Sequence, residues 1–186
     1  MTMEHKIGGL LALLVLAADQ LTKDWLIGLL AANPGGIELT SFFNLVMVWN
    51  RGVSFGLFSS DDPGRRWILI LVTAAIVLWL MIWLWRAEGR VLALALGGVI
   101  GGALGNIVDR IRLGAVADFF DFHVAGWHWP AFNFADGAIV AGVFLLLIDS
   151  FRSAPGQSTP GQSTPGQSAP GQSAPGKPNS GDSQPN

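Results

Sequence analysis

Two aspartates stand at the edges of apolar segments long enough to cross a membrane. Asp118 lies within Val116–Phe120, and Asp136 is followed by an almost purely apolar run to Ile148. A carboxylate at the middle of a bilayer costs about 2.5–3.5 kcal/mol, so such residues usually face a protein interior and often carry function. Two carboxylates that converge can share one proton, an arrangement that activates water for hydrolysis.

Each aspartate also has a plainer explanation. Asp118 could cap a helix, and Asp136 would suit the first turn of a helix, where the macrodipole favours negative charge. The pair favours the functional explanation, because the flanking apolar segments are consecutive and antiparallel and can bring both carboxylates to one depth. Asn133 precedes Asp136 by three residues and could orient it from the same helical face.

The first apolar segment carries a second polar group. Asp19 and Lys23 are four residues apart, in the order that favours an ion pair on one helical face. They could neutralise each other near the membrane surface, with Lys23 extending toward water. Equally, their face of the helix could line a site.

The third apolar segment is rich in glycine. Gly97, Gly101 and Gly105 form successive small-xxx-small steps, which let another helix approach closely. A second, overlapping face carries Gly98, Gly102, Gly105, Asn106 and Asp109. We interpret the glycines as packing residues, so that Asn106 and Asp109 project toward whatever packs there.

Two further polar groups have mainly structural interpretations. Asp109 is predicted to form an ion pair with Arg110 or Arg112. The segment that begins Asn50-Arg51-Gly52 and ends at Gly56 would be a turn between strands if it stood alone.

Composition excludes several classes of protein. The chain has 186 residues, of which 51% are hydrophobic and 13% charged, whereas a soluble domain typically carries about 25% charge. It has no cysteine, and its net charge of −2 gives no reason to expect a nucleic-acid partner. His123 and His128 lie beside Asp121 in a predicted loop, which is a poor metal site. We expect neither a metal nor an organic cofactor.

Four segments can cross roughly 30 Å of hydrocarbon as helices. They are residues 7–30, 67–85, 91–108 and 134–151. No small-residue cleavage site follows the first, so we expect an uncleaved span. The second is read as mostly lipid-facing, Val77 included. Four spans place both termini on one side of the membrane.

The connections between these segments differ in length. Residues 86–90 form a tight turn. Residues 31–66 contain strand-like pieces at 37–39, 44–49 and 53–58, which predict a small sheet on the membrane face. Residues 111–133 form the second long connection on that side. Residues 1–152 are therefore expected to form one transmembrane domain, and 153–186, a Pro-Gly-Gln-Ser repeat, a disordered tail.

Charge alone leaves the orientation open. The termini and the short turn hold Lys6, Arg86, Arg90, Arg152 and Lys177, and the long connections hold Arg51, Arg65, Arg66, Arg110 and Arg112. Because the rule that cytoplasmic loops are positive finds no clear excess on either side, it does not decide between the two topologies.

Taken together, the polar blocks resemble those of signal peptidase II, the bacterial lipoprotein signal peptidase. The matching blocks are Asp19–Lys23, Asn50–Gly56, Gly101–Arg110, Val116–Phe119 and Phe132–Asp136, in the family's order. Each block alone is weak evidence for the family, but five blocks in this order are a specific signature. The resemblance covers about residues 5–152. Gly137 stands where many members have serine, a departure we expect to be tolerated.

The resemblance implies an all-α membrane protein with four transmembrane helices and a small periplasmic β-cradle, both termini being cytoplasmic. It implies an aspartic endopeptidase of the bacterial inner membrane, with Asp118 and Asp136 as its catalytic dyad and its active site toward the periplasm. The substrate would be a diacylglyceryl-modified prolipoprotein, cut before the lipidated cysteine, with membrane lipid as the other partner and the chain acting as a monomer. Site-shaping roles fall to Asp19, Lys23, Asn50, Gly52, Asn106, Asp109, Arg110 and Asn133.

Two other functions compete with this one. A small proton-coupled transporter would also use membrane aspartates and a lysine, although the sequence shows no inverted repeat. A serine–lysine peptidase would use Ser54 as nucleophile and Lys23 as base.

Overall fold

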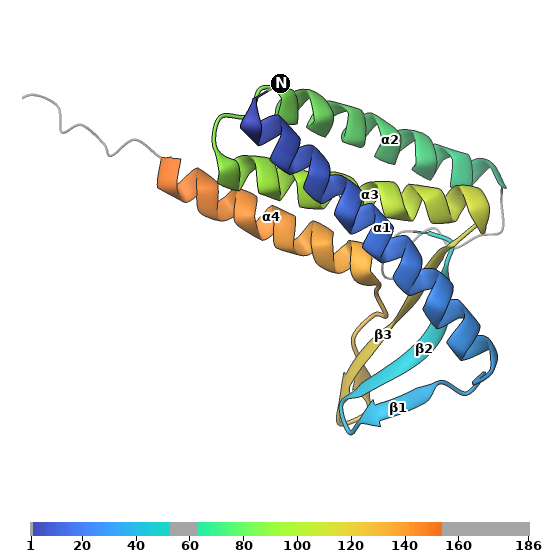
Figure 1. Cartoon of the computed structure of the whole chain (residues 1–186). Coiled ribbons are helices and arrows are strands. Elements are labelled where there is room, and N and C mark those ends of the chain that lie inside the picture. The colour runs from blue at the N-terminus through green and yellow to red at the C-terminus, as the bar shows by residue number, and fades with distance from the viewer. Residues whose placement is uncertain (1, 53–62, 154–186) are drawn as a thin grey trace, which may run out of the picture. The chain divides into compact units, whose positions relative to one another are not determined.

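The computed structural model describes residues 2–52 and 63–153, which form four helices and a small sheet (Figure 1). In chain order the elements are α1 (Met3–Ala31), β1 (Ile37–Thr40), β2 (Phe43–Asn50), α2 (Pro63–Trp85), α3 (Arg90–Arg112), β3 (Val116–Val124), β4 (Trp127–His128) and α4 (Phe134–Ser153). The mainly helical fold with a small sheet is thus confirmed. The strand predicted at 53–58 and the repeats from residue 154 lie outside the described residues.

Helix α3 is the centre of the helical part and packs against α1, α2 and α4. Of its most apolar stretch, 61% is buried, against 22% for α2 and 11% for α4. The glycines explain this position, because they remove side chains from two faces of α3 and let two helices approach closely.

One glycine face of α3 meets α1 and the other meets α4. A Cβ atom at Gly97 or Gly101 would collide with the backbone of Gly8 or Ala12 on α1, and one at Gly102 would collide with the backbone of Ala135 on α4. The predicted packing role of these glycines is therefore confirmed.

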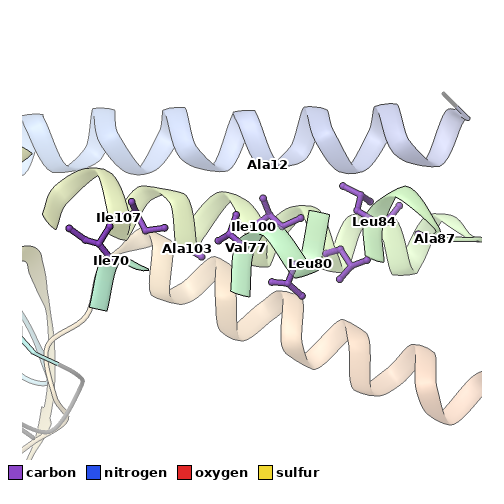
Figure 2. Close-up of a cluster of buried hydrophobic side chains, with 11 residues drawn as sticks. Ala12, Ile70, Val77, Leu80, Leu84, Ala87, Ile100, Ala103 and Ile107 are labelled. Atoms are coloured by element: carbon purple, nitrogen blue, oxygen red, sulfur yellow. The ribbon is translucent and has the colours of Figure 1, made fainter. Parts of the chain in front are cut away.

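Helix α2 packs on α3 through larger side chains. Ile70, Val77, Leu80 and Leu84 form a buried cluster with residues of α3 that include Ile100 (Figure 2). Val77 is only 4% exposed, so its expected lipid-facing position is wrong. The sequence of α2 does not indicate which of its faces is buried, because apolar residues cover all of them.

Three helices among the described residues are long and apolar enough to cross a membrane. They are Gly64–Trp85, Arg90–Arg112 and Phe134–Phe151. Helix α1 has 29 residues but carries Asp19, Lys23 and Asp24 in its second half. A fourth span stays a prediction.

The sheet is antiparallel throughout, in the order β1-β2-β3-β4. Strands β3 and β4 lie within the connection predicted at residues 111–133. They place His123 and His128 on strands, so the loop predicted for these histidines is wrong. The two strands are joined by a two-residue turn in which Ala125 (φ 50°) and Gly126 (φ 81°) both have positive φ, as the right-handed twist of a tight hairpin requires. Figure 1 shows the sheet beside the ends at which α1 finishes and α4 begins.

Candidate active site

Asp118 lies on β3, not at the end of a membrane span. It is the third residue of the strand and pairs in register with Val48 of β2. Its side chain is buried, with 2% exposed. Helix α3 ends at Arg112, and a turn through Gly114, at a φ of 82°, leads directly into β3. The alternative in which Asp118 caps a helix is therefore wrong.

Asp136 lies in the first turn of α4, and Asn133 caps that turn. The Asp136 backbone N–H donates to Oδ1 of Asn133 at 3.0 Å, and the Asn133 N–H donates to Oδ2 of Asp136 at 3.2 Å. Such reciprocal bonds satisfy two backbone donors that a helix N-terminus otherwise leaves free. The predicted helical position of Asp136 is confirmed, and its side chain is fixed by the same capping bonds.

Asn133 also contacts the other aspartate. Its Nδ2 donates to Oδ1 of Asp118 at 2.7 Å, and its side chain is fully buried. One asparagine thus bonds to both carboxylates, and the structure brings Asp118 and Asp136 to a common site, as the sequence predicted.

Two more asparagines each donate a hydrogen bond to one of the two carboxyls. Asn106 on α3 donates from Nδ2 to Oδ1 of Asp136 at 2.9 Å. Asn50, the last residue of β2, donates from Nδ2 to Oδ2 of Asp118 at 3.1 Å. Each carboxyl therefore has neutral amide donors on it, which fix its orientation without adding charge.

A buried ionic triad lies next to this site. Lys23 on α1 places Nζ 2.8 Å from Oδ2 of Asp19 and 2.8 Å from Oδ2 of Asp109 on α3. All three side chains are essentially buried, at 0–1% exposed. The Asp19–Lys23 pair is thus confirmed, but Lys23 does not extend to solvent.

The partner predicted for Asp109 is wrong. Asp109 faces α1 and pairs with Lys23, whereas Arg112 pairs with Asp24 at 3.3 Å. Successive residues of a helix point about 100° apart, so Arg110 is turned away from α1 and serves another purpose.

Asp19 and Asp109 of the triad hold the backbone beside Asp136 and Asp118. Oδ1 of Asp19 accepts from the N–H of Ala135 at 3.0 Å, and Oδ2 of Asp109 accepts from the N–H of Ala117 at 3.3 Å. Ala135 precedes Asp136 and Ala117 precedes Asp118. Helices α1 and α3 therefore fix the start of α4 and of β3 at the residues adjoining the site.

Arg110 ties the end of β2 to α3. Its guanidinium donates to the backbone oxygens of Gly52 at 3.1 Å and of Asn106 at 3.2 Å. The N–H of Gly52 in turn donates to Oδ1 of Asn50 at 3.1 Å. All eight predicted site-shaping residues thus belong to one connected set around Asp118 and Asp136.

The model of the signal peptidase (SPase) II family matches residues 11–152 of the chain. The chain belongs to the signal peptidase II family. Named lipoprotein signal peptidases are close to it in sequence. That of Beijerinckia indica is 50% identical over 150 residues, covering 79% of this chain and 89% of the relative, and that of Methylorubrum extorquens is 50% identical over 151 residues, covering 79% and 87%.

Solved structures agree with this membership. A bacterial membrane enzyme determined by the in meso method at 2.3 Å is 27% identical, with a TM-score of 0.68, covering 82% of this chain and 93% of its own. A second bacterial membrane enzyme, at 1.9 Å, is 26% identical with a TM-score of 0.66, covering 78% and 93%. The chain is thus a membrane protease of this family, and the transporter alternative is not favoured.

Gln20 belongs to the network but is not among the site residues that the sequence predicts. Gln20 donates from Nε2 to Oδ1 of Asp109 at 2.9 Å and to Oδ2 of Asp19 at 3.2 Å, and its Oε1 accepts from Arg112 at 2.8 Å. The sequence feature that could have identified Gln20 is its place inside the block Asp19–Lys23, next to Asp19, which it contacts.

Electrostatics set Asp118 apart from ordinary carboxyls. Burial, followed by the nearby Asp136 carboxyl, raises the pKa of Asp118 to about 6, against the opposing effect of hydrogen bonds from Asn50 and Asn133. A carboxyl with such a pKa can carry a proton near neutral pH.

The histidines belong to a different part of the sheet. Nδ1 of His128 lies 2.9 Å from Asp121, and the rings of His123 and His128 stack across the β3–β4 pair. Within the part of the chain that the structure describes, no three His, Asp or Glu side chains are placed to hold a metal ion. Ser54 lies outside the described residues, and Lys23 is engaged in the ionic triad.

Proposed function

We propose that this protein removes the signal peptide from diacylglyceryl-modified prolipoproteins, cutting before the lipidated cysteine, with Asp118 and Asp136 as the catalytic dyad. The observation that carries the proposal is the hydrogen bonding of Asn133 to both carboxyls. The side-chain amide of Asn133 donates to the Asp118 carboxyl on a strand, and its backbone N–H donates to the Asp136 carboxyl on a helix. One buried residue thus holds both carboxyls in one site, where they could share a proton.

The mechanism follows from the electrostatics of the pair. Asp118, whose pKa is raised to about 6, keeps the proton and donates a hydrogen bond to the oxygen of the scissile carbonyl. Ionised Asp136 takes a proton from a water molecule, which attacks the carbonyl carbon. The proton then passes to the departing amide nitrogen as the C–N bond breaks, which leaves a carboxylate on the signal peptide and a free amine on the lipidated cysteine.

The remaining site residues position this pair. Asn50 and Asn106 orient the outer carboxyl oxygens, while Arg110 holds Gly52 and hence the turn that carries Asn50. Asp19, Lys23 and Asp109 fix the backbone on which the two aspartates stand. The chemistry needs no metal or organic cofactor, since both proton transfers have a carboxyl to perform them.

The membrane arrangement is also part of the proposal. We infer that α1 is a fourth span, since 29 residues extend about 44 Å as a helix and its buried Asp19 and Lys23 neutralise each other. Residues 1–152 would form the membrane-embedded peptidase domain, acting as a monomer on prolipoprotein and lipid, with nucleic acid playing no part. The family's arrangement supports an inner-membrane location, cytoplasmic termini and an active site, with its β-cradle, on the periplasmic side.

Cleavage of a purified diacylated prolipoprotein tests the dyad. Asp118→Asn and Asp136→Asn should each lower kcat by at least about 10²–10⁴-fold, because each removes a catalytic acid or base. Their thermal unfolding should change little, since an amide is close to a carboxyl in size. Asp121→Asn is the matched control, because Asp121 is a buried aspartate on the same strand that pairs with His128. Near-normal turnover by either well-folded dyad variant would remove the aspartic mechanism.

A further inference from the structure

We propose that a groove along α4 binds an acyl chain of the substrate, and that Gly137 keeps its entrance open beside Asp136. This inference rests on the proposed function, because it assumes that the diacylated cysteine is presented to the Asp118–Asp136 pair. It names a specificity-determining residue that forms no part of the hydrogen-bonded network described above.

The groove begins at the proposed catalytic residue and extends away from it along the helix. It has a volume of about 760 Å³. Its lining includes Trp129, Phe132, Asp136, Gly137, Val140 and Phe144, and Asp136 is the only ionisable residue among those that line it. From Asp136 to Phe144 the helix rises by about 12 Å, so the apolar lining follows α4 for about two turns from Asp136.

Gly137 differs from the glycines that pack the helices together. Gly102 and Gly142 each face backbone atoms of a neighbouring helix, whereas a Cβ at Gly137 would meet no atom within 4 Å. Glycine inside a helix is less favourable than alanine, and no neighbouring helix requires it at 137. A side chain at 137 would instead fill the entrance of the groove, immediately next to Asp136.

The chemistry of the substrate identifies the occupant. The diacylglyceryl group is attached to the sulfur of the cysteine that follows the scissile bond. When the scissile carbonyl lies at the pair of carboxyls, the glyceryl carbons are therefore only a few bonds from Asp136. An apolar groove that opens at Asp136 is therefore in the right place to receive one of the two chains.

The groove suits an acyl chain better than a peptide. The backbone of α4 is hydrogen-bonded within its own helix, Pro130 has no N–H, and the N–H groups of Trp129 and Phe132 donate to β3. A peptide backbone entering an apolar groove needs hydrogen-bond partners, and the N–H groups of Trp129 and Phe132 are already engaged. A hydrocarbon chain needs none.

Two substrates of identical sequence, carrying dipalmitoylglyceryl or diacetylglyceryl on the cysteine, test the proposal with the full-length enzyme in one lipid mixture. The quantity measured is the ratio of kcat/KM for the long-chain substrate to that for the short-chain substrate. Gly137→Leu should lower this ratio about tenfold, since leucine closes the entrance and removes the advantage of the long chain. Val140→Trp, at a residue 69% exposed in the groove, should lower it too.

Gly28→Leu is the matched control. Gly28 is an exposed helical glycine that also faces open space, and it is not part of the groove. It should leave the ratio unchanged. All three variants should unfold at or above the temperature of the natural protein, and Val140→Trp decides the matter if Gly137→Leu does not fold.

An unchanged ratio in a folded groove variant would overturn the proposal. So would a loss that follows the side chains before the cysteine and not the acyl length, since the groove would then hold the signal peptide. Neither outcome touches the proposed dyad, which fails only if Asp118→Asn or Asp136→Asn still cleaves.

Discussion

At the scale of single residues, the site depends on neutral amides placed around two acids. Asn133 bonds to both carboxyls, while Asn50 donates to that of Asp118 and Asn106 to that of Asp136. Amides orient a carboxyl whether or not it is protonated, so they suit a pair in which a proton changes place during the reaction.

The bond from Asn50 makes a prediction about pH. It stabilises ionised Asp118 and so lowers its pKa. Asn50→Leu should raise that pKa, and the protonated form that the mechanism requires would persist to higher pH. The alkaline limb of the kcat/KM profile should shift upward by roughly 0.5–1 pH unit.

Asn44→Leu provides the comparison, because Asn44 lies on the same strand and bonds to Asp121 instead. Its alkaline limb should stay where it is. A downward shift in Asn50→Leu would mean that the proton resides elsewhere in the catalytic cycle.

At the scale of elements, charge and close packing join the helices at different depths. Helix α1 contacts α3 through glycines toward one end and through the triad of Asp19, Lys23 and Asp109 toward the other. Both kinds of contact tolerate little change, for different physical reasons.

Removing the cation of the triad should be severe. Lys23→Met would leave Asp19 and Asp109 buried and facing each other without compensation, which typically costs about 3–5 kcal/mol. A large fall in the midpoint of thermal unfolding should report this loss. Lys6→Met, at an exposed position of the same helix, should change the midpoint little, and equal effects from both would argue against a structural triad.

The glycine contacts allow a sterically matched comparison. Gly101→Leu should impair folding, because its side chain would enter the backbone of α1 at Ala12. Gly9→Leu should be tolerated, since no atom lies within 4 Å of a Cβ there. Expression level and thermal unfolding measure both, and similar damage in the two variants would mean that the packed face is wrongly assigned.

The elements show what a sequence can and cannot reveal. Helix positions followed from apolar length and the glycine face from its spacing. Strand β3 is not predicted, although Val116–Val124 is rich in aromatic and β-branched residues, because its position between two apolar spans indicates only a connection. The partner of Asp109 and the burial of Val77 depend on how helices rotate against one another, and nearest neighbours along the chain do not determine that rotation.

At the scale of the whole molecule, the proposed chemistry needs only residues 1–152. The residues beyond Ser153 include no apolar side chain larger than proline. Truncation after Ser153 should leave kcat/KM for a lipidated substrate within about twofold, a barrier change of only ~0.4 kcal/mol. Loss of activity in a stably expressed truncated protein would make the repeats a functional element.

The bond between Asp19 and the N–H of Ala135 joins the first helix to the last across 116 positions of sequence. During synthesis, a partly made chain has Asp19 in place long before Ala135 leaves the ribosome. The carboxyl pair is therefore assembled only when the final helix has been inserted beside the first. A chain interrupted before α4 would lack Asp136 and could not form the proposed dyad.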